Sequence, residues 1–260
     1  ESPRPEGVKH RGGDTFGWIN PGADGGHRHQ VPRTTHVLDR PVAATNAVTT
    51  SPVTGAPMAW CIQTGDNTDN RTDREVAWWM ALLNGGTVVP NSGADGRYEG
   101  IQRSGWRGAW HPDDPSRDVY GQAGFPMLPG FLDAAVRPFE AEGLQVPWLA
   151  VFGNHDVIFQ GSFGPLPSGL HIDRIEAMLA GTSRKPLGYV GMVRAVAHAR
   201  QVGTDTARWE AAAPRPGTQV VTADPDARRA LPLDEYLTRL VADGDHGFGP
   251  RHVAEHTSWW

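Results

Sequence analysis

Cysteine is almost absent from this chain, since Cys61 is the only one in 260 residues. A single cysteine excludes a disulfide within the chain and excludes a zinc site built from several thiolates. Long hydrophobic runs are absent as well, because no apolar stretch approaches the length of a membrane span. An excess of positive charge is also lacking. The net charge is −5, which argues against a surface that binds the nucleic-acid backbone.

Glycine and proline are abundant instead, with 32 and 22 residues beside a hydrophobic content of 38%. This composition is typical of a globular protein with long ordered loops. The length fits one large domain or two small ones. We expect a single domain over residues 1–260, with loop-rich inserts at roughly 84–130 and 157–231.

Two short apolar runs, at 58–64 and 147–152, have the character of buried strands. A helix is predicted after the first of them, because Thr72 and Glu75 have the spacing of a capping box. Gly85 is expected to end this helix.

Ala77, Met80 and Ala81 are expected on the buried face of that helix. Further helices are predicted at 131–143 and 233–244, and a short one at 41–50 that begins near Pro41. Strand, helix, long loop, helix and strand in this order indicate an α/β fold.

Polar clusters follow both predicted strands: "GDNTDN" begins at Gly65 and "GNHD" begins at Gly153. Ligands of open α/β sheets bind outside the carboxyl ends of strands, so both clusters lie where a site is expected. The carboxylate of Asp66 and the amide oxygen of Asn154 suit a divalent cation, and His155 is expected to face the same space. The alternative is that these residues only form turns, in which Asn and Asp side chains bond their own backbone.

The succession of "GDNTD" and "GNHD" resembles the calcineurin-like metallophosphoesterases. More narrowly, "VTGAPMAWCIQTGDNTDN" and "PWLAVFGNHD" resemble a bacterial branch that carries long inserts and often a twin-arginine export signal. The resemblance implies an αββα sandwich, a dinuclear centre of two divalent metal ions such as Mn, Fe or Zn, and hydrolysis of phosphoesters. It also implies an extracytoplasmic location, although no export signal is visible in the chain.

The resemblance also implies a role for each motif residue. Asp66 matches the carboxylate that bridges two metals, and Asn154 matches an amide ligand of the second metal. His155 matches the histidine beside the scissile phosphate, and Asp69 matches the carboxylate that orients it. The implied mechanism is attack by a metal-bridging hydroxide while the histidine assists the leaving oxygen. Asp156 is assigned a supporting role only.

The pattern departs from the family at both ends. An Asp-x-His is expected near the first strand and a Gly-His-x-His after the second cluster, and the sequence contains neither at those places. "GHRH" at 26–29 precedes both clusters, so we interpret His27 and His29 as loop residues. We interpret the departures as truncation at both ends, and we expect this chain by itself to be inactive.

Two further features bear on the substrate. Asn70 stands where protein phosphatases of the family carry an arginine, which argues against a protein phosphatase. The first insert contains Trp106, Arg107, Trp110 and His111, which could stack on or contact a substrate. We favour the simpler interpretation that its tryptophans anchor the loop.

The sequence therefore predicts a metal-dependent phosphomonoesterase or phosphodiesterase that acts on a small phosphoester, with no membrane span and no evident nucleic-acid surface. Two alternatives remain: another metal hydrolase that uses the same strand ends, or a non-catalytic binding module on the same fold. An Asp-x-His upstream of Glu1 and a Gly-His-x-His downstream of Trp260 in the gene would favour the enzyme.

Overall fold

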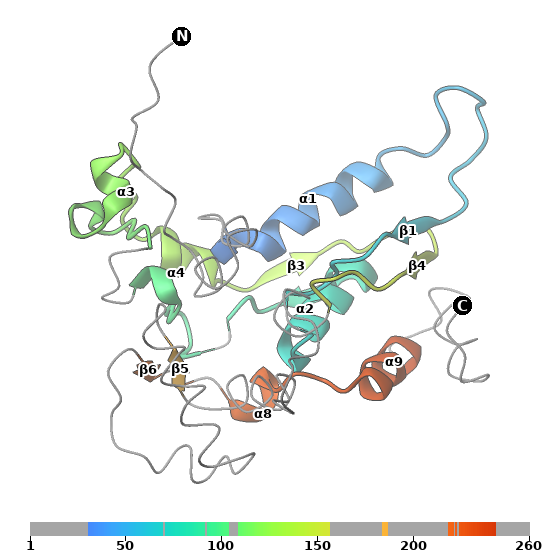
Figure 1. Cartoon of the computed structure of the whole chain (residues 1–260). Coiled ribbons are helices and arrows are strands. Elements are labelled where there is room, and N and C mark those ends of the chain that lie inside the picture. Colours follow the sequence, from blue (N-terminus) through green and yellow to red (C-terminus); the bar gives the residue numbers. More distant parts are fainter. Residues whose placement is uncertain are drawn as a thin grey trace.

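The computed structural model describes residues 31–156 apart from 70, 92 and 104–108, and residues 184–186, 218–220, 222 and 224–242. In these ranges it has helices together with three two-stranded sheets (Figure 1). None of the described helices is long and apolar enough to cross a membrane. The elements in chain order are η2 (Val31–Arg33), α1 (Thr34–Asn46), β1 (Cys61–Gln63), α2 (Asp73–Asn84), β2 (Gly86–Val88), η3 (Ile101–Arg103), η4 (Pro115–Arg117), α3 (Val119–Gln122), α4 (Phe131–Ala135), β3 (Phe139–Ala141), β4 (Trp148–Ala150), β5 (Arg184–Pro186), β6 (Thr218–Val220), α8 (Pro225–Arg228) and α9 (Leu233–Ala242).

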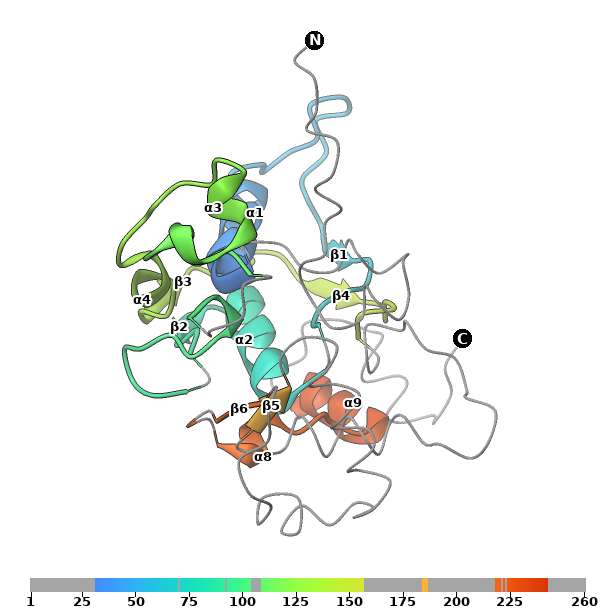
Figure 2. The same ribbon diagram turned by 60° about the vertical axis from the view of Figure 1, so that its left-hand side comes forward.

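Helix α2 lies between the first insert and the β1–β4 pair, as both ribbon views show (Figures 1 and 2). Its capping box is confirmed: the Thr72 hydroxyl accepts from the Glu75 backbone N–H, and the Glu75 carboxylate accepts from the Thr72 N–H at 2.9 Å. Gly85, at φ +84°, ends the helix as predicted. The start and the end of α2 are therefore both set by residues beside it in sequence.

The predicted buried face of α2 is partly wrong. Ala77 is exposed and Ala81 is only partly buried, whereas Met80 is buried as expected. Large side chains take the interior instead, because burying them removes more apolar surface from water than burying alanine does. The buried residues of the helix are Val76, Trp79, Met80, Leu82 and Leu83.

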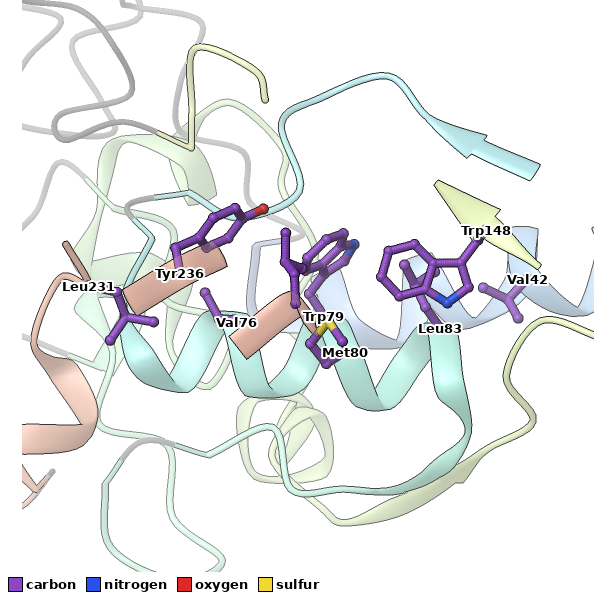
Figure 3. Close-up of a cluster of buried hydrophobic side chains, with 9 residues drawn as sticks. Val42, Val76, Trp79, Met80, Leu83, Trp148, Leu231 and Tyr236 are labelled. Atoms are coloured by element: carbon purple, nitrogen blue, oxygen red, sulfur yellow. The ribbon is translucent and has the colours of Figure 1, made fainter. Parts of the chain in front are cut away.

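A hydrophobic cluster joins α2 to α1, β4 and α9 (Figure 3). At its centre the Trp79 ring meets Trp148 of β4 edge-on, with 5.4 Å between centroids, and stacks on Tyr236 of α9 at 6.3 Å. The buried members of the cluster are Val42, Val76, Trp79, Met80, Leu83, Trp148, Leu231, Tyr236 and Leu240.

The two predicted strands form a parallel pair, β1 and β4, but β1 is not buried as predicted, because Ile62 at its centre is 44% exposed. Cys61 is paired with Trp148 and Gln63 with Ala150, so both strands end at the same edge. The pairing extends by one bond from the Val151 N–H to the Gln63 carbonyl, at 2.9 Å. The two other described pairs, β2–β3 and β5–β6, are antiparallel. An α/β content is present, and the αββα sandwich stays a prediction.

Two helix predictions are corrected by the structure. Helix α1 begins at Thr34 rather than near Pro41, which lies inside it. Packing explains why the helix continues past the proline: Leu38 before it and Val42 after it both pack into the hydrophobic cluster. The predicted helix at 131–143 ends at Ala135, and its last part is the strand β3. The helix predicted at 233–244 is confirmed as α9 within two residues.

Aromatic packing holds the described part of the first insert around Trp110. The buried Trp110 ring lies 5.8 Å from Phe125 and 5.7 Å from Phe131, and its indole N–H donates to the Pro126 carbonyl. His111 is buried as well, against the Asp118 carboxylate. Trp110 and His111 therefore anchor the loop. Trp106 and Arg107 lie outside the described residues.

Candidate active site

Two glycines let the strand ends approach each other closely. Gly65 has φ +107°, and a Cβ placed on it would lie 2.7 Å from the Gly153 Cα. A Cβ on Gly153 would overlap the backbone nitrogen of Asp66. Glycine is required at both positions, because any side chain would force the two loops apart.

Asp66 follows Gly65 with φ +54°, in the left-handed region that residues other than glycine seldom adopt. Its Oδ1 accepts the backbone N–H of His155 at 3.0 Å, and its side chain is exposed. Residues with such a backbone conformation are common at functional sites. The contact holds the first carboxylate of "GDNTDN" beside the histidine of "GNHD".

The His155 imidazole lies against the Asp69 carboxylate, with 2.9 Å between Nδ1 and Oδ1. An ionised carboxylate can only accept, so Nδ1 is the donor in this contact and carries a proton. Nε2 is then left for another partner. The exposed fractions of the two side chains are 32% and 53%, so the pair stands at the surface, where a substrate can reach it. These are the two residues that the family resemblance pairs; their catalytic roles remain predictions.

Asp156 is fully buried and joins the two loops. Its Oδ1 accepts the backbone N–H of Thr68 at 2.7 Å and the Thr68 hydroxyl at 2.8 Å. Its Oδ2 accepts the backbone and side-chain N–H groups of Asn67, both at 3.1 Å, and the Gly153 N–H at 2.9 Å. The sequence motif pointed to a supporting role. The structure shows that this role is to hold the turn after β1 against the turn after β4.

Arg71 completes this arrangement, and sequence reasoning missed it. Its Nε donates to the Leu231 carbonyl at 2.6 Å, and its Nη1 donates to the Asp156 carbonyl at 3.2 Å. Its guanidinium also lies 5.7 Å from the centre of the Phe152 ring. The side chain is buried, which is uncommon for arginine without bonding partners. A single arginine two residues after Asp69 gives no signal in the sequence that it would be buried.

Asn154 lies in the exposed turn between Gly153 and His155. The Asp66 carboxylate and the Asn154 amide oxygen are hard donors, the kind of ligand that divalent cations prefer. Two such residues supply only part of a coordination shell. Within the described ranges, no group of three or more His, Cys, Asp or Glu residues could hold a metal.

His27 and His29, which we interpret from the sequence as loop residues, and Asn70 lie outside the described residues.

A cavity of about 470 Å³ opens beside this cluster. Asp66, Asp69 and His155 all contribute to its lining. Comparison of the chain with protein-family models, with curated proteins and with solved structures found no match.

Proposed function

We propose that this chain provides part of the active site of a metal-dependent phosphoester hydrolase. One observation carries the proposal: at the ends of two parallel strands, His155 contacts Asp66 and Asp69, which lie 89 and 86 residues before it in the chain. The motifs that contain them are the ones that resemble the calcineurin-like metallophosphoesterases. A turn by itself needs no imidazole held by a carboxylate.

In this proposal Asp66 and Asn154 hold divalent metal ions of the Mn, Fe or Zn type. When bound, such ions neutralise the phosphoryl oxygens and lower the pKa of water, which then supplies the nucleophile. The other ligands would come from residues outside the described ranges.

His155 acts on the leaving group. Water adds to phosphorus and releases a proton to the solvent, the bond from phosphorus to the ester oxygen breaks, and that oxygen takes a proton from Nε2 of the imidazolium, which solvent later restores. Asp69 stabilises the imidazolium through Nδ1 and keeps Nε2 directed away from itself, because the 2.9 Å contact fixes the ring. Asp156 and Arg71 position these groups and touch no substrate. The substrate is a small phosphomonoester or phosphodiester, and the location is extracytoplasmic.

The test is an assay of the full reading frame that encodes this chain, loaded with Mn²⁺ and given an aryl phosphate. We expect hydrolysis by the parent protein and a fall to the metal-free level in Asp66→Asn, because the substitution removes a charged ligand. Bound manganese, measured per chain, should fall in parallel.

Asp95→Asn is the matched control, since Asp95 is an exposed carboxylate of the first insert. Full activity in Asp66→Asn would remove this residue from the mechanism. Manganese bound at Asp66 without hydrolysis of any phosphoester would favour the non-catalytic binding module.

A further inference from the structure

The cavity beside His155 has the size of a ligand site. Its volume of about 470 Å³ lies within the range of pockets that enclose a small organic molecule. Asp66, Asp69 and His155 form part of its wall. A phosphoryl group bound at these residues would therefore stand at the mouth of the cavity, with the rest of the substrate inside.

One face of α2 forms a second part of the wall. Glu75, Trp78, Trp79 and Leu82 line the cavity, and this spacing places them on the same side of a helix. Leu38 of α1 adds another apolar side chain. Of these side chains Trp78 and Leu38 are half-buried and can contact an occupant of the cavity, whereas Trp79 and Leu82 are only 2% exposed and belong mainly to the core.

Residues of the first insert form another part of the wall of the cavity, and they include Pro90, Tyr98 and Glu99. The described part of the insert is held by aromatic packing and by Asp133, whose carboxylate accepts the Tyr98 N–H at 3.1 Å and an Arg103 N–H at 2.6 Å. The first insert therefore determines part of the shape of the cavity.

The charge of the wall is negative. Among the described lining residues the acidic side chains are Asp66, Asp69, Glu75 and Glu99, and the basic one besides histidine is Arg228. Glu99 is ionised over the whole neutral range: burial alone would raise its pKa, but hydrogen bonds from Thr222 and Arg97 outweigh burial and lower the pKa to about 2. A second anionic group on the substrate would be repelled here.

On the basis of the function proposed above, we propose that this cavity receives the leaving group of the substrate, and that this group is an apolar ring system without negative charge. Burial of a ring against apolar walls is favourable, and the carboxylates of Glu75 and Glu99, which bind no metal in the proposed function, disfavour a further anionic group such as a second phosphate. The first insert is then the element that selects the substrate.

Binding of 2-naphthol and of 2-naphthalenesulfonate to the full-length protein without metal tests this inference. The two probes share a ring system, and only the second carries a charge at neutral pH. We expect 2-naphthol to bind at least about tenfold more tightly, which corresponds to 1.4 kcal/mol. Isothermal titration calorimetry gives both dissociation constants.

Leu38→Trp should weaken 2-naphthol binding by about tenfold or more, because it fills the cavity. Val37→Trp is the matched control, since Val37 is the neighbouring residue and its exposed fraction is 54%. Thr34→Trp is a second filling variant, at a lining position that is exposed. Circular dichroism checks that each variant is folded.

The inference is overturned if 2-naphthol does not bind, if the sulfonate binds as tightly, or if both filling variants bind like the parent. Hydrolysis is measured separately, as kcat/KM for 2-naphthyl phosphate against methyl phosphate. Binding of 2-naphthol without any hydrolysis would refute the proposed function and leave the ligand class standing. Equal hydrolysis of both esters without 2-naphthol binding would refute the ligand class and leave the function standing.

Discussion

At the scale of single residues, the candidate site depends on a buried carboxylate that touches no substrate. Asp156 accepts hydrogen bonds from Thr68, which lies 88 residues earlier, and from the Gly153 N–H of its own turn. Arg71 binds the backbone of the same residue. The exposed pair of Asp69 and His155 is held in register by this buried network.

Asp156→Ala should lower the free energy of unfolding by on the order of 3 kcal/mol, because it leaves buried hydrogen-bond donors without an acceptor. Five N–H and O–H donors lose their acceptor. Urea unfolding measures the change. Asp95→Ala, at an exposed position, should stay within about 0.5 kcal/mol of the parent. Equal stability of the two variants would show that Asp156 does not join the loops.

At the scale of elements, α2 connects the candidate site to the hydrophobic core. Its first turn is fixed by the Thr72–Glu75 capping box, which begins three residues after Asp69. Its middle carries Trp79 into the contact with Trp148 of β4. A change at the start of α2 therefore acts on the loop that carries Asp69 as well as on the helix.

Thr72→Ala should destabilise the protein by about 1 kcal/mol, since the hydroxyl no longer accepts the Glu75 N–H. Urea unfolding followed by far-ultraviolet circular dichroism detects the loss. Thr49→Ala is a suitable control, because Thr49 is exposed and lies outside the described helices. A Thr72→Ala protein as stable as Thr49→Ala would mean that tertiary packing, rather than the cap, holds this end of α2.

At the scale of the whole molecule, the first insert is joined to a segment far along the chain. The Glu99 carboxylate accepts the backbone N–H and the hydroxyl of Thr222, both at 2.8 Å, across 123 residues. It also pairs with Arg97 at 2.7 Å. The ionised carboxylate accepts these bonds more strongly than the protonated acid does, so the connection depends on pH.

The pKa of Glu99 falls from 4.5 to about 2 on folding. Its stabilising contribution is therefore complete above about pH 5 and is lost as the pH falls towards about 2. Asp133 and Glu235 contribute in the same direction, because hydrogen bonds from Arg103 and Arg229 respectively lower the pKa of each carboxyl.

We expect the urea midpoint of the parent protein to fall steadily over this acid range. Glu99→Gln should be less stable at neutral pH and should show a shallower decline, since its amide does not titrate. Parallel pH profiles for the parent and the variant would contradict a role for Glu99 in joining the two segments.

Local features could be predicted from the sequence because their partners are neighbours. Thr72 and Glu75 are three residues apart, so the start of α2 follows from the chain itself, and Gly85 ends the helix next to it. The two polar clusters could be placed at strand ends for the same reason. By contrast, Pro41 suggested a helix start, and the packing of Leu38 and Val42 overrode that signal.

Only the tertiary structure decided what these local features form together. The parallel pairing of β1 with β4 brings Asp66 and His155 into contact, and no local signal sets that pairing. The burial of Asp156 and Arg71 and the cavity walled by the first insert depend on the same long-range packing. Propensities and caps act over three or four residues, whereas the candidate site is built from contacts across more than eighty.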